Sequence, residues 1–499
     1  MSGQRFIKNI YSSVLIRVVI ALSLLMFITV NAHATELVLS QPLTGDVVAY
    51  SHQSFLVAGL SNKQPQLSVI IITEENQLIE KENYQLKQNH YQGFASAYLA
   101  INDNNQAQTT PKEHIVLFGT EGIYLAKEEG KTLLIEQPSL FRVIDNKKFS
   151  HLPLVYDVNV DGLSDFILPD FHQYWVFVQN EQGEFAQSKL AYSSTVNFQS
   201  STFDDTSVQF VLPKQIKLLD VNNDGDLDIV FASKHTVQYF LQDKKGNFDK
   251  QPKKMALPIE LSAPESTVES YSNTTRYAFN RFDDINADGV QDIVIEKKTY
   301  EKDISDGIQQ VLVLFGQYNS NKQLSFELKR STSITHKGEL MDYGFADFNG
   351  DALKDLYFLG ADLGAISVLS ALWGGSFIVD INIYTLDRKK GFSKKPDVSK
   401  KTEFIVDMNQ IVFGSIVHIA DIDGDKRSDL LLQSDDNELA IYSGNSKRLL
   451  TKRSQKIKVD LPADPNLITI VKLKQDAQIK VLIRHKLKNN QTKFTVLNR

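Results

Sequence analysis

The chain has 499 residues and a formal net charge of -6 at pH 7. Hydrophobic residues make up 42% and charged residues 23%, which excludes a disordered, collagen-like or polytopic membrane chain. Cysteine is absent, so disulfides, thiolate zinc sites, iron–sulfur clusters and cysteine nucleophiles are excluded, and any metal must bind through oxygen or imidazole. The small net charge gives no reason to expect nucleic acid as a partner.

Residues 1–34 have the pattern of a secretory signal peptide. Basic residues precede an apolar stretch from Val18 to Val30, and the small residues Ala32 and Ala34 follow it at a cleavage position. The stretch is shorter than the ~20 residues that a spanning helix needs. We therefore expect a mature chain with no transmembrane span, secreted to the periplasm or the outside of the cell, where calcium is plentiful enough to fill a weak site.

Five segments share one nine-residue template. Aspartate stands first and ninth, and acidic or amide side chains stand at alternate positions between them. The segments begin 63, 64, 63 and 74 residues apart, which indicates a repeat fold of stacked units. Their bounds are Asp157 to Asp165, Asp220 to Asp228, Asp284 to Asp292, Asp347 to Asp355 and Asp421 to Asp429.

Short apolar runs bounded by turn residues precede and follow these templates, and they predict β-strands. A unit of about 60 residues with about four strands has the size of a propeller blade, and a closed ring of blades protects strand edges. We therefore predict an all-β fold in which residues 35–499 form a single β-propeller, with its repeats clearest at 150–435. Dividing the 465 residues that follow the leader by 63 predicts seven blades, with six or eight as the alternatives.

The remaining blades have to lack the acidic template. His114 to Ala126 has the pattern of strands that follow a template, and Asn102 to Asn105 is a degenerate version of the acidic loop. Further strand candidates lie near both ends of the chain, and we expect ring closure to pair the two ends in one blade. These candidates are Glu36 to Leu39, Leu67 to Ile72, Ile468 to Leu473 and Ile479 to Ile483.

The template predicts calcium sites. Calcium takes about six to eight oxygen ligands, and side chains at alternate positions of a tight loop converge on one point, where the carbonyl of the seventh residue fills the gap. Without the ion the crowded carboxylates repel one another, so metal binding and loop folding are coupled. We predict three to five structural Ca²⁺ sites, with these ligands: Asp157, Asn159, Asp161, Leu163, Asp165; Asp220, Asn222, Asp224, Asp226, Asp228; Asp284, Asn286, Asp288, Val290, Asp292; Asp347, Asn349, Asp351, Asp355; Asp421, Asp423, Asp425, Asp429.

These loops differ from the helix–loop–helix calcium hand, which needs a glutamate at position twelve. Apolar residues of the following strand occupy that position, so the predicted role of the metal is structural and not that of a sensor. The alternative is that the loops are Asp- and Asn-rich turns whose side chains cap their own backbone without metal. The residues at position twelve are Leu168, Phe231, Ile295, Phe358 and Leu432.

Glycine placement separates the last two loops from the first three. Gly162, Gly225 and Gly289 stand at the sixth position, where a left-handed backbone turns the chain. The fourth and fifth loops have another residue there and carry their glycine earlier in the turn. We therefore expect these two loops to differ in shape or to bind metal more weakly. The residues concerned are Ala352 and Lys426 at the sixth position, and Gly350 and Gly424 before them.

The loop pattern D-x-N-x-D-G-x-x-D, the apolar strand after it and the repeat length resemble the FG-GAP (VCBS-type) repeats of integrin α-chain-like β-propellers. The resemblance runs from about residue 150 to 435. It implies a seven-bladed propeller with calcium loops on one face and ligand contacts on the other. For the metal it carries over to Asp157, Asn159, Asp161, Asp165 and their counterparts. It identifies no partner, because bacterial propellers of this kind serve as adhesion, glycan-binding or scaffold modules and sometimes as parts of polysaccharide-degrading enzymes.

No catalytic residue can be assigned from the sequence. The motifs of zinc proteases, α/β-hydrolases, phosphate-binding loops and dinucleotide sites are absent, although a propeller enzyme can place an acid and a base on separate blades without a local motif. Trp175, Trp373 and Tyr174 are candidate platforms for stacking on a sugar. Trp175 directly precedes strand residues, so packing between blades is the better interpretation.

Two stretches are strongly basic. Residues 443–499 carry 14 Lys and Arg against three Asp, a net charge of +11. A second run, from Arg388 to Lys401, lies in the insertion that lengthens the fourth interval to 74 residues. Such a segment attracts anionic polysaccharide, lipid headgroups or an acidic protein face, or it is simply a solvated loop.

The sequence as a whole predicts a secreted, calcium-stabilised β-propeller that is a non-catalytic binding or scaffold module at the cell envelope. The expected partner is a protein or an anionic glycan, and the expected state is a monomer. A propeller-type polysaccharide lyase or hydrolase is the alternative from another class. A purely structural component of an envelope assembly is the third.

Overall fold

The computed structural model describes residues 33–498 except for internal gaps. The predicted leader lies outside the described residues apart from His33 and Ala34, which begin strand β1 (His33–Leu39). No helix among the described residues is long and apolar enough to cross a membrane. The gaps are 40–42, 44, 52, 62–63, 87–90, 102–106, 128–129, 143–148, 194, 201–205, 212–214, 244–245, 265–271, 302–307, 337–338, 362–374, 408–411, 475–478 and 488–490.

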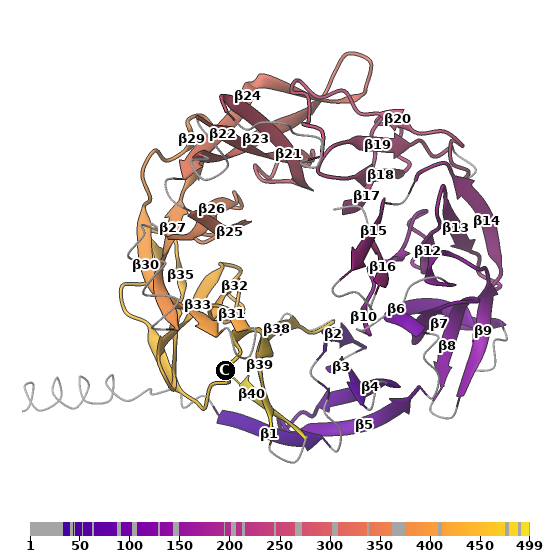
Figure 1. Ribbon diagram of the computed structural model, residues 1–499, viewed down its shortest axis with the longest axis horizontal. Coiled ribbons are helices and arrows are strands. Elements are labelled where there is room, and N and C mark those ends of the chain that lie inside the picture. The colour runs from indigo at the N-terminus through magenta and orange to yellow at the C-terminus, as the bar shows by residue number, and fades with distance from the viewer. Residues whose placement is uncertain are drawn as a thin grey trace, which may run out of the picture.

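Eight sheets of four or five strands form a closed ring in the described part of the chain, as Figure 1 shows. Within a blade, consecutive strands pair antiparallel, and the blades are numbered here in chain order. Blade 1 consists of β2 (Val47–Tyr50), β3 (Ser54–Ser61), β4 (Gln64–Ile72) and β5 (Leu78–Gln85). Blade 2 consists of β6 (Tyr91–Ile101), β7 (Ala107–Gly119), β8 (Gly122–Lys127) and β9 (Gly130–Glu136), with β10 (Ser150–His151) added parallel to β6. Blade 3 consists of β11 (Val155–Tyr156), β12 (Asp165–Pro169), β13 (Tyr174–Gln179) and β14 (Phe185–Leu190), and blade 4 consists of β17 (Gln215–Leu219), β18 (Asp228–Ala232), β19 (Val237–Phe240) and β20 (Lys253–Lys254).

The second half of the ring is built in the same way, except that the last blade takes a strand from the other end of the chain. Blade 5 consists of β21 (Thr274–Asp283), β22 (Asp292–Tyr300), β23 (Ile308–Tyr318) and β24 (Leu324–His336). Blade 6 consists of β25 (Glu339–Ala346), β26 (Asp355–Ala361), β27 (Ser376–Tyr384), β30 (Val398–Asp407) and β31 (Val412–Gly414). Blade 7 consists of β32 (Val417–Ala420), β33 (Asp429–Asp435), β34 (Glu438–Tyr442) and β37 (Gln455–Lys458), and blade 8 consists of β38 (Ile468–Lys472), β39 (Ile479–Lys486), β40 (Thr492–Asn498) and β1.

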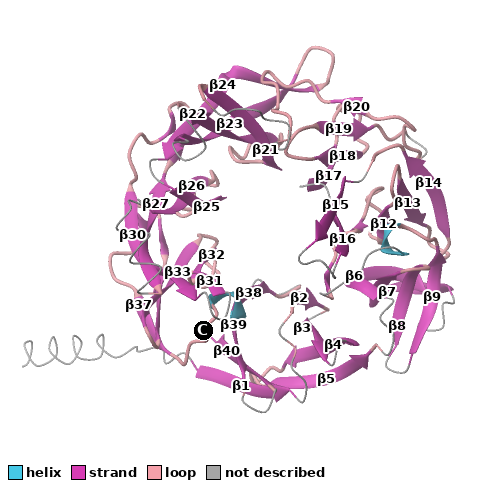
Figure 2. Ribbon diagram, in the orientation of Figure 1, coloured by secondary structure: helices cyan, strands magenta, loops and turns pink. Residues whose placement is uncertain are grey.

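Three two-stranded sheets and two short 3₁₀ helices complete the described elements, and strands dominate Figure 2. The helices are Leu140–Arg142 and Pro465–Leu467. The small sheets pair β15 (Thr195–Ser200) with β16 (Thr206–Val211), β28 (Leu386–Asp387) with β29 (Gly391–Phe392), and β35 (Gly444–Asn445) with β36 (Leu449–Leu450).

The hydrophobic core is divided among the blade boundaries. Each of eight clusters of buried side chains joins two neighbouring blades. Strand β12 shows why: Phe166 and Leu168 point toward blade 2, and Ile167 points toward blade 4. Because side chains alternate between the two faces of a strand and both faces are covered, the inner strands need continuous apolar runs. This is the pattern by which the sequence predicted strands.

The two ends of the described chain close the ring, as predicted. Strand β1 pairs antiparallel with β40 and places Leu37 opposite Phe494. Phe494 is fully buried, and its ring lies 6.2 Å from that of Phe55 in blade 1. The closing blade therefore contacts its neighbour through the same kind of apolar cluster as the other blades, and a strand from one end of the chain completes a sheet from the other end.

The predicted count of seven blades is wrong, and the alternative of eight is correct. The error came from dividing the chain by a repeat length that holds only where the acidic loops occur. Blade 1 occupies Val47 to Gln85 and needs far fewer residues, because it has tight connections in place of the nine-residue loop. The segment Leu67 to Ile72 belongs to this separate blade and not to the closing blade.

We predict that Phe494→Ala lowers the free energy of unfolding by about 3–5 kcal/mol, because it removes a fully buried ring from the closing contact. Urea titration measures the change. Val38→Ala on the same strand pair is the control: Val38 is 48% exposed, so its truncation should cost only about 0.5 kcal/mol or less. Equal losses in both variants would contradict the role of this contact in closure.

Candidate metal centre

The five templates form equivalent loops on one face of the ring. Each connects the innermost strand of its blade to the second strand, in blades 3 to 7, and the ninth residue is the first residue of that second strand. Since consecutive strands are antiparallel, the connections between third and fourth strands lie on this same face. The loop face therefore carries five acidic loops and the outer hairpin turns of the same blades.

The ninth aspartate connects three strands in each of these blades. In blade 3, Asp165 is fully buried, and its Oδ2 accepts a hydrogen bond from the backbone N–H of Val158 at 2.8 Å. Its Oδ1 accepts one from the backbone N–H of Gln179, at the end of the third strand, also at 2.8 Å. The ninth aspartates of the other four loops are likewise fully buried, and each accepts the two equivalent bonds. The backbone N–H donors are Val221 and Gln242 for Asp228, Ile285 and Gly316 for Asp292, Phe348 and Leu386 for Asp355, and Ile422 and Gly444 for Asp429.

Burial raises the pKa of four of these five carboxyl groups. Asp165, Asp292 and Asp355 are raised to about 7 and Asp228 to about 6. Loss of hydration is the main cause, the neighbouring loop carboxylates add to it, and the two backbone N–H groups oppose it. A group with this pKa is partly protonated near neutral pH, so a cation placed beside it would displace protons.

The first and fifth residues organise the loop backbone. In the first loop, the Asp157 carboxylate accepts from the N–H of Asp161 at 3.1 Å and of Gly162 at 2.9 Å. Asp161 Oδ1 in turn accepts from the N–H of Leu163 at 2.8 Å, and the amide of Asn159 donates to Asp161 Oδ2 at 2.8 Å. The side chains predicted as ligands therefore shape the turn through hydrogen bonds within the loop. The seventh residues, including Asp226 and Val290 in later loops, donate their N–H to the fifth side chain in the same way.

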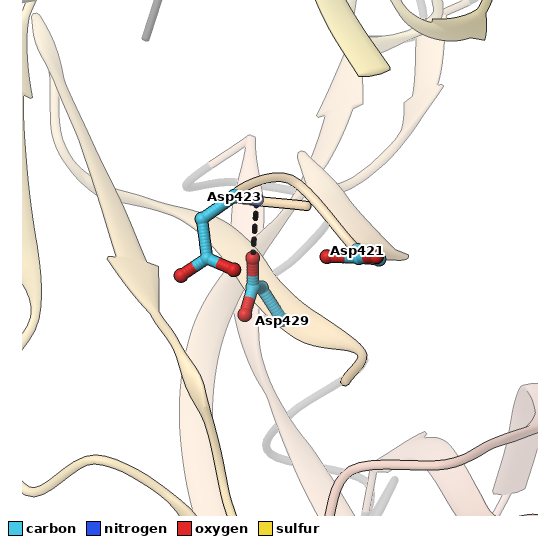
Figure 3. A group of neighbouring side chains, drawn as sticks. All are labelled: Asp421, Asp423 and Asp429. Carbon is cyan, nitrogen blue, oxygen red and sulfur yellow. Dashed lines mark hydrogen bonds between the residues drawn. The ribbon is translucent and has the colours of Figure 1, made fainter. Parts of the chain in front are cut away.

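The fifth loop brings together three carboxylates. Ligand oxygens of Asp421, Asp423 and Asp429 all lie within 4.8 Å of one another, as Figure 3 shows, and the Asp423 N–H donates to Asp429 Oδ2 at 3.3 Å. The other loops carry asparagine at the third position, so this loop has one more carboxylate among its first, third, fifth and ninth residues. Its fifth-position residue, Asp425, forms a salt bridge with Arg427, which removes part of that excess.

Two buried oxygens bear on whether a cation fits. Among the described residues, Asn222 Oδ1 and Asp421 Oδ1 are buried and have no hydrogen-bond donor. A buried acceptor without a partner is costly, and a cation supplies what a missing donor would. Both atoms belong to side chains predicted as ligands. The donor set is made only of carboxylate, amide and carbonyl oxygens, which suits a hard divalent ion such as calcium.

All five loops share one backbone shape, so the expected difference in shape between the first three and the last two loops is wrong. Each loop has two left-handed residues, at the fourth and sixth positions, and the glycine simply occupies one or the other. The fourth and sixth residues, with their φ values, are Val160 (59°) and Gly162 (82°), Asn223 (53°) and Gly225 (96°), Ala287 (53°) and Gly289 (83°), Gly350 (79°) and Ala352 (68°), and Gly424 (78°) and Lys426 (69°).

Hydrogen bonds also tie four of the acidic loops to the following blade. In these four loops the carbonyl of the second residue accepts a bond from that blade. The donors are Gln242 Nε2 to Val158 (3.0 Å), Leu324 N to Val221 (2.8 Å), Lys354 N to Ile285 (2.9 Å) and Asn445 N to Phe348 (2.9 Å).

The role of the repeated glutamine could not be derived from the sequence. Gln179 and Gln242 recur at equivalent positions. Gln179 Oε1 accepts from the N–H of Ala100 in blade 2 at 2.7 Å, and its amide donates to the carbonyl of Ser164 at 3.0 Å. The spacing was the available signal, but it could not show that the side chain crosses to a neighbouring blade.

The aromatic candidates for sugar stacking belong to the core where they are described. Trp175 is 9% exposed in the cluster between blades 2 and 3, with the Lys189 ammonium 4.5 Å from its ring centroid. Tyr174 is fully buried against blade 4. The interpretation that Trp175 packs between blades is confirmed. Trp373 and the degenerate loop at 102–105 lie outside the described residues, whereas the strands expected between His114 and Ala126 are present in β7 and β8.

Residues 220–295 match the family model of the FG-GAP-like repeat. This segment begins at the second acidic loop, runs through blade 4 and includes the third loop and the start of β22. The protein is a β-propeller that contains an FG-GAP-like repeat. The sequence matches no curated protein.

Solved structures similar to this β-propeller are distant from it. An Agrocybe aegerita lectin that recognises non-reducing terminal N-acetylglucosamine is 14% identical with a TM-score of 0.43, covering 82% of this chain and 94% of its own. The Photorhabdus luminescens Tc holotoxin pore is 13% identical with a TM-score of 0.32, covering 89% of this chain and 17% of its own. The dihydro-heme d1 dehydrogenase NirN is 10% identical with a TM-score of 0.34, covering 85% and 78%. These similarities concern the fold alone.

We predict that, in excess chelator, the buried ninth aspartates make the protein less stable as the pH rises from about 5 to about 8. Their pKa in the folded protein lies above the ordinary value of 3.8, so the folded state binds more protons than the unfolded state. This contribution is lost as the pH rises through the folded pKa. Thermal melts across the range measure it. Asp165→Asn, which stays neutral, should show a weaker dependence, and an unchanged slope in this variant would contradict the assignment.

We predict that Val160→Asn stabilises the protein by about 1 kcal/mol, because a β-branched residue is strained in the left-handed region and asparagine tolerates it. Val160 is 70% exposed, so the substitution removes little packing. Chemical denaturation measures the gain. The reverse exchange at the equivalent position, Asn223→Val, should lose a similar amount, and a gain there would refute the shared backbone shape.

Proposed function

We propose that this protein is a secreted, calcium-stabilised β-propeller that works as a non-catalytic binding or scaffold module for a protein or carbohydrate at the cell envelope. The observation that supports it most is the fivefold repetition of one oxygen-rich loop whose ninth carboxylate is buried and hydrogen-bonded in the same way each time. A group repeated in five blades has a structural task, since a reaction centre needs one site and not five.

Calcium would act as a clip between the first and second strands of blades 3 to 7. The first, third and fifth side chains and the seventh carbonyl would hold it, with the ninth carboxylate using its remaining lone pairs. A bound ion would offset the repulsion among the loop carboxylates and their loss of hydration. Because four of the loops are hydrogen-bonded to the next blade, this stabilisation would extend to the neighbouring blades and not stay local.

A rigid ring is suited to recognition. Loops that are ordered before binding lose little entropy when a partner arrives, so more of the contact energy appears as affinity. Eight apolar blade boundaries and a closed sheet at the chain ends hold the frame. The proposed mechanism is therefore fixed presentation of surface groups, with no conformational switch.

The enzymatic alternative, a polysaccharide lyase or hydrolase, is favoured by one cavity. A space of about 210 Å³ beside the β18–β19 connection, on the face opposite the acidic loops, is lined by His235, Arg276 and Glu296 among others. Glu296 Oε1 accepts a hydrogen bond from Tyr343 Oη at 3.1 Å. Burial raises the pKa of this tyrosine far above its usual range, so the phenol stays protonated. Product release from anionic glycans that disappears in Glu296→Gln would favour this alternative.

We predict that excess chelator lowers the melting temperature and that added calcium restores it, because the ion binds only the folded loops. Asp224→Ala should reproduce part of the loss and reduce the calcium-induced shift. Differential scanning calorimetry with and without calcium measures both.

Asp226→Ala is the matched control for Asp224→Ala. It removes the same charge from the same loop, but only the backbone carbonyl of residue 226 is a proposed ligand. Its calcium-induced shift should therefore equal that of the unmodified protein. A melt that excess chelator leaves unchanged would refute the calcium proposal.

A further inference from the structure

Two clefts of the same construction lie on the loop face, one at the boundary of blades 5 and 6 and the other at the boundary of blades 6 and 7. Their volumes are about 410 Å³ and about 580 Å³. In each cleft one wall carries the third-position asparagine of an acidic loop, Asn286 or Asn349. The opposite wall is the outer hairpin turn of the following blade. The two clefts are therefore equivalent positions of the repeat.

Both outer hairpin turns are basic. The β28–β29 turn of blade 6 places Arg388, Lys389 and Lys390 in the first cleft. The β35–β36 turn of blade 7 places Lys447 and Arg448 in the second. The matching turn of blade 3 reads Asn180-Glu181-Gln182-Gly183 and that of blade 5 reads Asn319-Ser320-Asn321-Lys322, whereas that of blade 4 reads Asp243-Lys244-Lys245-Gly246. Adjacent cations therefore occur in the turns of blades 4, 6 and 7 and not in those of blades 3 and 5.

The two basic stretches of the sequence meet in the second cleft. Lys400, from the basic run of blade 6, lines it together with Lys447, Arg448 and Lys452 from the C-terminal stretch. The Lys400 ammonium lies 3.9 Å from the ring centroid of Tyr442, which holds it toward blade 7. Segments about 50 residues apart in the chain therefore present their charge to one space, and the propeller fold brings them together.

The cations of the two hairpin turns, with Lys400 and Lys452, are available to a ligand, whereas Lys329 in the first cleft is paired with Glu327 at 2.8 Å. In the described part of the chain none of the turn cations or Lys400 and Lys452 forms a salt bridge. The one carboxylate that lines the second cleft, Asp397, accepts hydrogen bonds from Ser393 Oγ at 2.6 Å and from Thr385 Oγ1 and N at 2.8 and 2.9 Å. In the first cleft, the Asp288 carboxylate accepts from the N–H of Val290.

Each basic turn is fixed by buried residues directly beside it. Leu386 and Phe392 anchor the first turn in the cluster between blades 5 and 6, and the Phe392 N–H donates to Thr332 Oγ1 of blade 5 at 3.0 Å. Leu449 and Leu450 anchor the second turn in the cluster between blades 6 and 7. The positive charges are thus held in place before a ligand arrives, which lowers the entropy cost of binding.

We propose that these two clefts bind successive anionic groups of a linear acidic polysaccharide, bearing sulfate or carboxylate, that runs across the loop face of blades 5 to 7. The inference rests on the proposed binding function and specifies its ligand. A polymer with a regularly repeated anion matches a cation cluster repeated once per blade. Protein partners usually need buried aromatic anchors, and Phe315 is the single aromatic residue that lines either cleft among the described residues.

Isothermal titration calorimetry with dextran sulfate, polygalacturonate and neutral dextran tests the proposal. We expect the calcium-loaded protein to bind at least one of the two acidic polymers, more weakly at high salt, and not to bind neutral dextran. The comparison between the acidic polymers tells sulfate from carboxylate. A quadruple variant should lower the affinity for the bound polymer at least tenfold. It combines Lys389→Ala, Lys390→Ala, Lys447→Ala and Arg448→Ala.

The matched control is Lys81→Ala/Lys253→Ala/Lys472→Ala/Lys486→Ala, which removes the same charge from exposed positions on β5, β20, β38 and β39. It should keep an affinity within about twofold, since interactions between exposed charges are screened beyond about 10 Å. An equal loss in the control would show attraction by net charge alone and overturn the proposal. Binding of neither acidic polymer, or tighter binding to poly-glutamate or to phosphatidylserine vesicles, would overturn it as well.

A sulfated tetrasaccharide separates the two clefts. We expect two molecules to bind per chain, and one after either Lys389→Ala/Lys390→Ala or Lys447→Ala/Arg448→Ala; an unchanged stoichiometry would overturn the two-site proposal. Melting curves of the same variants with and without calcium keep the two proposals apart. If calcium raises the melting temperature but no polymer binds, only the polysaccharide proposal is refuted. If calcium does not raise the melting temperature, calcium stabilisation is refuted.

Discussion

A buried carboxylate at the ninth position of each acidic loop is the interaction on which this side of the molecule depends. It accepts one backbone N–H from the loop and another from the third strand, so a single side chain fixes three strands relative to one another. Burying that group costs hydration, as its raised pKa indicates. Under the proposed function, a cation held by the oxygens of the loop would compensate for this cost.

The ring around these loops is held by apolar contacts between blades. Each of the eight clusters of buried side chains among the described residues joins two neighbouring blades. Stability in such a fold is shared among neighbouring units, and closure matters because an open ring would expose two apolar faces. Strand β1 removes that problem by completing the sheet that the C-terminal strands begin.

The acidic loops and the basic turns share one face, and the repeat explains both. Every blade from 3 to 7 offers a loop after its first strand and a turn after its third, and the residues that these connections carry differ from blade to blade. Five loops keep the acidic template, whereas the turns of blades 4, 6 and 7 carry adjacent cations, and those of blades 6 and 7 line the two clefts. One scaffold thus supports a proposed stabilising role and a proposed recognition role through local differences in sequence.

The sequence by itself determined the strand content, the five loops and the residues that line them, because these features are local and repeat with a constant spacing. It could not determine the number of blades, since blade 1 has no acidic loop to mark it. It also misjudged the shape of the last two loops, because a template with two left-handed positions allows the glycine at either one. Only the tertiary structure decided that Gln179 reaches blade 2 and that Lys400 meets Lys447, because contacts between blades depend on how neighbouring sheets pack and not on residues close in the chain.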